Sequence, residues 1–140
     1  MMAYATRADI EAVYGLTLLP SIADYDHDGA VDAAVVAAAL DHATGVINSH
    51  LSVRYKLPLP TVPAFLKAAA IDLAVYRIAN TADRLTNEMR LRYEDHIRHL
   101  ERIADGKAGL GFEDSAPGDS EDTPDATASG RAYSFKSVRA

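Results

Sequence analysis

The spacing of apolar residues predicts helices over most of the chain before Gly109. One long helix is expected to start at Asp32, because apolar residues then recur every three or four positions on one face. A second long helix is expected from Pro63 to about Asn80, and it is apolar on most faces, which places it at the centre of the fold. The apolar residues of the first are Val35, Val36, Ala39, Leu40, Ala43, Val46, Ile47 and Leu51, and those of the second include Phe65, Leu66, Ala69, Leu73 and Tyr76.

Two further helices are bounded by capping signals. A short amphipathic helix is expected between Thr6 and Gly15, with Asp9 completing a capping pattern. A last helix is expected from Thr86 to Gly106. The Leu19-Pro20 region, which follows the short first helix, is expected to be a loop. These elements predict a mainly α protein, a compact bundle of about four helices.

Between the two long helices lies a stretch that cannot be helical. Pro58, Pro60 and Pro63 remove backbone donors and favour extended conformations in the residues before them. We therefore expect a stiff, proline-rich arm bearing Tyr55, Leu57 and Leu59.

Composition changes after Gly111 and divides the chain into three parts. Residues 1–111 form the predicted helical domain. Residues 112–130 are rich in Gly, Ser, Asp and Pro and hold six acidic residues and no basic one, which predicts a flexible acidic linker. Residues 131–140 hold three basic residues and an apolar set, Tyr133, Phe135 and Val138, which predicts either an extended docking segment on a leash or simple disorder.

Composition also limits the chemistry. The chain of 140 residues has no cysteine, so disulfides and thiolate metal sites are excluded. No segment approaches the roughly 20 apolar residues that span a bilayer, and the first residues lack the apolar region of a signal peptide, so we expect a soluble protein made in the cytoplasm. The first 112 residues carry 14 acidic and 11 basic side chains, a balance that offers no basic surface for general nucleic-acid binding.

Aspartates alternate along the segment from Asp24 to Asp32, with Gly29 placed for a sharp turn. This is the first half of an EF-hand calcium loop, whose closing glutamate would fall at Val35. Two interpretations remain open: a weak structural calcium site, or an Asp/Gly turn leading into a helix capped by Asp32. The calcium ligands would be Asp24, Asp26, Asp28, the Ala30 carbonyl and Asp32.

Asp72 and Arg77 are charged residues on the otherwise apolar central helix. A partly buried charge needs a partner, so we expect structural ion pairing, either with each other or with Arg54 or a neighbouring subunit. An active-site pair is the weaker alternative, since no nucleophile or base lies beside them. His96 and His99 have the spacing of two metal ligands but no accompanying ligand pattern, and are expected to face solvent.

Three classes of function follow from these features. An enzyme has little support, because no catalytic triad, phosphate loop or zinc signature occurs. A calcium-regulated binder would need the missing glutamate and a paired loop. A structural assembly subunit explains the helical body, the stiff arm and the C-terminal segment together.

The order and spacing of these motifs resemble the Mu-like phage gene product 36 family, over nearly the whole body up to about Gly111. The matching segments are Met2–Asp9, Asp24–Gly29, Val35–Leu51, Arg54–Leu59, Ile71–Arg77, Arg92–Glu94 and Gly106–Lys107.

The resemblance implies a virion protein similar to the small helical head–tail connectors. About twelve copies would then form a ring between the portal and the tail, in the neck of the virion, and continue the DNA channel without sequence-specific binding. The partners implied are further copies of the chain, the portal protein and a downstream neck or tail-terminator protein, with no membrane and no required cofactor beyond optional calcium. A tail-side neck or completion protein and a soluble calcium-binding assembly factor are the alternatives. Our candidates for contact with other subunits and the portal lie in the proline-rich arm and the C-terminal segment, and they are Arg54, Tyr55, Leu57, Leu59, Tyr133, Phe135 and Val138.

Overall fold

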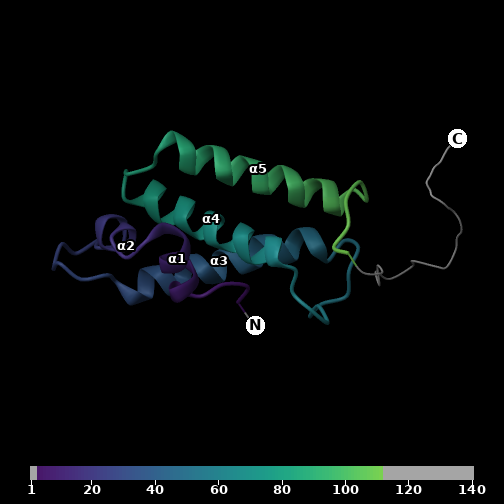
Figure 1. Cartoon of the computed structure of the whole chain (residues 1–140), viewed down its shortest axis with the longest axis horizontal. Coiled ribbons are helices and arrows are strands. Elements are labelled where there is room, and N and C mark those ends of the chain that lie inside the picture. The colour runs from purple at the N-terminus through teal and green to yellow at the C-terminus, as the bar shows by residue number, and fades with distance from the viewer. Residues whose placement is uncertain (1–2, 112–140) are drawn as a thin grey trace, which may run out of the picture.

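The computed structural model describes residues 3–111, and in this part of the chain all regular structure is helical. Figure 1 shows α4 between α3 and α5, with the short α1 and α2 at one side of this layer. The expected mainly α fold is confirmed. The helices are α1 (Arg7–Tyr14), α2 (Leu18–Ile22), α3 (Ala33–Leu51), α4 (Ala64–Thr81) and α5 (Asn87–Ala104).

The core lies where α3 and α4 meet, and α5 packs against both helices. Small buried residues on the facing surfaces, among them Ala39 and Ala43 of α3 and Ala70 and Ala74 of α4, let the two backbones approach closely. Larger side chains such as Ile47 fill the remaining space. The central position predicted for the second long helix is therefore confirmed, with nine of its residues buried.

The N-terminal helix is fixed by local hydrogen bonds. The Thr6 side chain accepts from the Asp9 N–H, and the Asp9 carboxylate accepts from the Thr6 N–H, which completes the predicted capping box. The helix ends at Gly15, whose φ of 88° lies in the left-handed region that glycine adopts without strain. Lys67 of α4 pairs with Asp9 at 3.5 Å and connects this helix to the bundle.

The prediction of a loop around Leu19-Pro20 is wrong, because these residues belong to α2. Pro20 is the third residue of this helix, where its missing N–H would have no intrahelical partner in any case. Leu19 and Ile22 are buried, so tertiary packing favours a single helical turn here.

The proline-rich segment leaves α3 and returns to α4 beside the C-terminal end of α5 (Figure 1). Its first residues are anchored in the fold, because the Tyr55 hydroxyl accepts a hydrogen bond from the Leu110 N–H at 3.1 Å and Tyr55 is 2% exposed. Gly106 ends α5 with a φ of 82°, and a Cβ there would lie 2.9 Å from Arg54 Nη1. Glycine is therefore favoured here by the backbone conformation, whereas the flexible end of the Arg54 side chain could move away from a Cβ.

The predicted body, residues 1–111, largely coincides with the described residues. The predicted linker, 112–130, and docking segment, 131–140, lie outside them. Across residues 3–111, no helix has the length and apolarity required for a transmembrane span.

Candidate functional site

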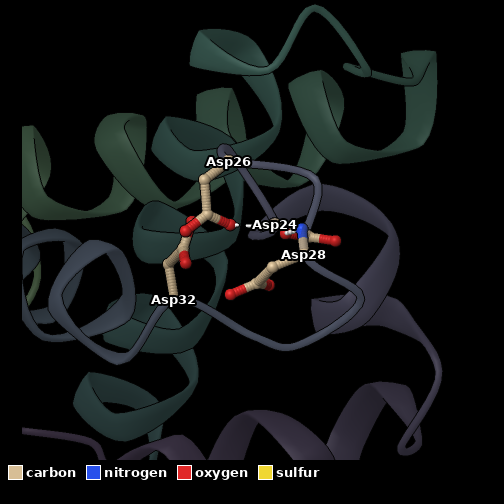
Figure 2. Close-up of side chains that lie close together, drawn as sticks. All are labelled: Asp24, Asp26, Asp28 and Asp32. Atoms are coloured by element: carbon tan, nitrogen blue, oxygen red, sulfur yellow. Dashed lines mark hydrogen bonds between the residues drawn. The ribbon is translucent and has the colours of Figure 1, made fainter.

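The aspartate loop gathers four carboxylates between α2 and α3 (Figure 2). One oxygen from each of Asp24, Asp26, Asp28 and Asp32 lies within 4.8 Å of the others. The loop is shaped by backbone N–H groups that point at Asp24, since Asp28 donates to its Oδ1 at 3.0 Å and Gly29 to its Oδ2 at 2.9 Å. The alternating pattern in the sequence therefore does place these oxygens on one side of the chain.

The carboxyl groups of the loop differ in acidity. Partial burial opposes ionisation of Asp24, but the N–H groups of Gly29 and Asp28 outweigh it and lower the pKa of Asp24. Loss of some hydration, a hydrogen bond shared with Asp24 and the charges of Asp28 and Asp32 raise the pKa of the exposed Asp26. Four acidic groups this close repel one another, and a bound cation would relieve that repulsion.

One of the two interpretations of this segment had the Asp32 side chain capping the long helix, and the structure shows no such hydrogen bond. Asp32 occupies the N-cap position, but its Oδ2 accepts from the Tyr25 N–H at 2.7 Å, across the loop. The side chain therefore closes the loop instead of the helix. Ala30 donates its N–H to Asp28 Oδ1 at 2.9 Å, and Val35 has no side-chain oxygen to offer at the twelfth position.

The second polar cluster centres on Asp72, and its partners differ from those predicted. Asp72 accepts from the Tyr14 hydroxyl at 2.5 Å and lies 2.7 Å from His96 Nε2, so it pairs with neither Arg77 nor Arg54. Arg92 donates to the Tyr14 hydroxyl at 3.2 Å. The cluster joins α1, α4 and α5, and the partners of Asp72 in it are not those expected from the sequence.

Electrostatics favour the charged form of Asp72 in this cluster. Burial by itself would raise the pKa of Asp72, but hydrogen bonds from His96 and Tyr14 outweigh it and lower the pKa of this carboxyl. Burial and the adjacent Asp72 carboxylate raise the pKa of Tyr14 to about 12. Tyr14 is therefore a hydrogen-bond donor throughout the physiological range.

Arg77 is exposed on the other side of α4. It lines a shallow polar depression with His42, Asn80 and Thr81, which lies between α3 and α4. Its charge lowers the pKa of His42, after the larger effect of burial. Arg77 is thus separated from Asp72, and its expected subunit contact stays a prediction.

The proline-rich arm forms one wall of an apolar groove of about 470 Å³. Leu57 and Leu59, both predicted contact residues, line this groove. The opposite wall comes from the N-terminal residues and from Asn48 of α3. The groove is lined by Ala3, Tyr4, Asn48, Leu57, Pro58, Leu59 and Val62.

The other predicted contact residues are placed differently. Tyr55 is a core residue that presents almost no surface to a partner. Its hydroxyl accepts the hydrogen bond from Leu110 inside the fold. Arg54 is half-buried and donates to the Ile103 carbonyl at 3.4 Å, near the end of α5. Tyr133, Phe135 and Val138 lie outside the described residues.

Sequence reasoning missed Tyr14 and Arg92 in the Asp72 cluster, and it expected His96 to face solvent. These residues are separated from Asp72 by at least 20 positions, so no local spacing connects them. The one available signal was Asp72 itself, since a carboxylate on an apolar helix needs donors from other elements.

Comparisons with known proteins identify relatives of this chain in a phage and in a prophage. The family model described as "Bacteriophage Mu, Gp36" matches residues 4–129. "Mu-like prophage FluMu protein gp36" of Haemophilus influenzae is 40% identical over 114 residues, which cover 81% of this chain and 79% of that protein. "Gene product J" of Escherichia phage Mu is 34% identical over 113 residues, 80% of this chain and 79% of its own length. The chain belongs to the Bacteriophage Mu Gp36 family.

Proposed function

We propose that this phage structural protein is a head–tail connector, a subunit of an oligomeric ring between the portal and the tail. Family membership implies a phage structural or morphogenesis protein and carries the broader part of this proposal. The helical bundle with a stiff apolar arm supports the finer part, because such an arm offers neighbouring subunits a preformed surface.

The ring would have about twelve copies and would act mechanically. It would contact the portal on one side and a neck or tail-terminator protein on the other. The near balance of charge in the first 112 residues suits a channel wall, since DNA must pass through it without being retained.

Disruption of the gene in the encoding phage or prophage tests this role. We expect DNA-filled heads and separate tails in electron micrographs, with infectivity restored by the wild-type gene supplied in trans. Cryo-electron microscopy of intact virions should then show the chain as a ring against the portal. Attached tails in the mutant, or a well-resolved neck without this chain, would contradict the connector role, and a ring only on the tail side would favour a completion protein.

We also propose that the aspartate loop binds a calcium ion and thereby stiffens the connection between α2 and α3. The proposal rests on the EF-hand-like spacing of the aspartates in the sequence, and hard oxygen ligands favour calcium among the common metals. The missing glutamate at Val35 implies a weak site with a structural role.

Calcium is expected to raise the melting temperature by a few degrees. At ten times the dissociation constant a ligand stabilises the folded state by about 1.4 kcal/mol. Differential scanning calorimetry of the full chain with calcium, and with magnesium for comparison, measures the shift. Asp24→Asn should abolish it, whereas Asp41→Asn, which removes an exposed carboxylate on α3 outside the loop, should retain it. No shift in excess calcium would show that the loop is a plain turn.

A further inference from the structure

The apolar groove beside the arm is built into the fold, and its walls are fixed from both sides. Leu57 and Leu59 pack against the core. Opposite them, the Tyr4 hydroxyl donates to Asn48 Oδ1 at 2.5 Å and ties the N-terminal residues to α3. The volume of the groove, about 470 Å³, falls in the range of roughly 300–1,000 Å³ that is typical of ligand pockets.

The groove is open to solvent and largely apolar. Val62 at its rim is 45% exposed, and the only polar side chains that line it are Tyr4 and Asn48. Pro58 makes the wall stiff, so an apolar occupant would lose little free energy to ordering of the arm. Such a groove fits a short peptide with one or two aromatic side chains.

The chain itself contains a segment of this chemistry beyond Gly111. Residues 131–140 carry two aromatic residues, Tyr133 and Phe135, followed by Val138. The groove lining carries no charged side chain, so the match between segment and groove is one of apolar surfaces and not of charge. No other part of the chain outside the described residues has two aromatic residues so close together.

The geometry of the chain allows this segment to reach a neighbour. The described chain ends beside the start of the arm, since Leu110 is bonded to Tyr55 (Figure 1). Residues 112–132 can span at most about 70 Å. The groove of an adjacent copy would lie on the order of 30 Å away, because a domain of this size has a radius of gyration of about 13 Å.

We propose that the groove formed by Tyr4, Asn48 and the arm residues Leu57, Leu59 and Val62 binds the Tyr133–Val138 segment of a neighbouring copy of this chain. The proposal rests on the ring architecture proposed above and names the contact that joins its subunits. A segment leaving one copy and entering a different surface of the next is a head-to-tail contact, which generates a ring when the rotation closes. A connection of about 21 residues has an r.m.s. length of roughly 25 Å, close to the span to a neighbouring groove, and effective concentration is highest where length and span match.

Disulfide trapping in the full-length protein tests this contact, because the natural chain contains no cysteine. Purified Val62→Cys and Phe135→Cys proteins, one of them enlarged by a tag, are mixed and oxidised, and the heterodimers are measured on a non-reducing gel, where their size separates them from both homodimers. The matched control is Val53→Cys, which replaces another exposed valine that does not line the groove. We expect the Val62→Cys mixture to form heterodimers at least about tenfold faster than the Val53→Cys mixture.

A protein carrying both Val62→Cys and Phe135→Cys distinguishes the two routes. Binding between copies gives a ladder of covalent oligomers, whereas crosslinked monomers alone would show that each tail fills its own groove and would overturn the proposal. Equal rates for Val62→Cys and Val53→Cys would also overturn it. A labelling result would overturn it as well. If added portal protein, but not added wild-type chain, protects the Val62→Cys thiol from maleimide, the portal is the occupant of the groove.

The outcome is separable from that of the connector proposal. A ring in the virion neck without trapping at Val62→Cys would reject the groove contact alone. Trapping between copies of a chain that is missing from the neck would reject the connector role and leave the groove contact standing.

Discussion

Replacing Tyr55 with alanine is expected to lower the free energy of unfolding by about 3–5 kcal/mol, the usual cost of removing a fully buried aromatic side chain. The ring is 2% exposed and lies at the junction of the arm and the end of α5. Its loss would leave a cavity and would also leave the buried Leu110 N–H without its acceptor. Both effects act in the same direction.

Tyr55→Phe separates the two effects. The ring remains and only the hydroxyl is lost, so we expect a cost of about 1–3 kcal/mol for the buried, unsatisfied N–H. Urea denaturation followed by far-ultraviolet circular dichroism measures both variants, with Val53→Ala as the exposed control. A Tyr55→Ala protein within about 1 kcal/mol of the wild type would show that the packing around Tyr55 is not as described.

Replacing Asp72 with alanine is expected to lower the free energy of unfolding by about 1–3 kcal/mol at neutral pH, because two partly buried donors lose their acceptor. The donors are Tyr14 and His96, from different helices, so the loss should loosen α1 and α5 from α4. The side chain of Asp72 is only 14% exposed, which limits compensation by water. Asp95→Ala, an exposed change on α5, is the matched control and should cost under about 0.5 kcal/mol.

The cost should depend on pH. Hydrogen bonds lower the pKa of Asp72 in the folded state, so its stabilising effect is present above the unfolded pKa of about 3.9. That effect is lost as the pH falls through the lower, folded pKa of Asp72. The wild type and Asp72→Ala should therefore converge in stability in strong acid, and a difference that stays constant from pH 7 to pH 2 would contradict this account.

His96→Ala completes a double-mutant cycle with Asp72→Ala. Groups in direct contact usually show a coupling energy of about 0.5–3 kcal/mol. We expect a value in this range at neutral pH, whereas additive effects would show that His96 does not stabilise Asp72.

The long helices could be predicted because each buries one face and repeats apolar residues with the helical period. The helix α2 could not, because Pro20 ordinarily argues against a helix and only the burial of Leu19 and Ile22 favours one. The sequence pattern thus predicts a helix correctly where the burial of its apolar residues and the helix propensity of its residues favour the same structure.

Of the two polar clusters, the sequence could predict one, the aspartate loop, and not the other, the partners of Asp72. The aspartate loop was visible because its four aspartates fall within nine consecutive positions, and the structure does gather the four side chains. The partners of Asp72 come from α1 and α5, and no spacing within α4 could reveal them. Tyr55 was misplaced since a neighbouring run of prolines suggested an exposed arm, while its ring in fact turns inward.

The hydrogen bond between Tyr55 and Leu110 determines how the molecule would bear a mechanical load. A pull on the chain beyond Gly111 meets this buried bond and the Tyr55 ring before it can peel α5 from the bundle. The tension is therefore passed to the base of the proline-rich arm and from there to α3 and α4. If neighbouring copies hold one another by their tails, force on the ring would run around its circumference through the bases of the arms and the paired helices α3 and α4, and α5 would be spared.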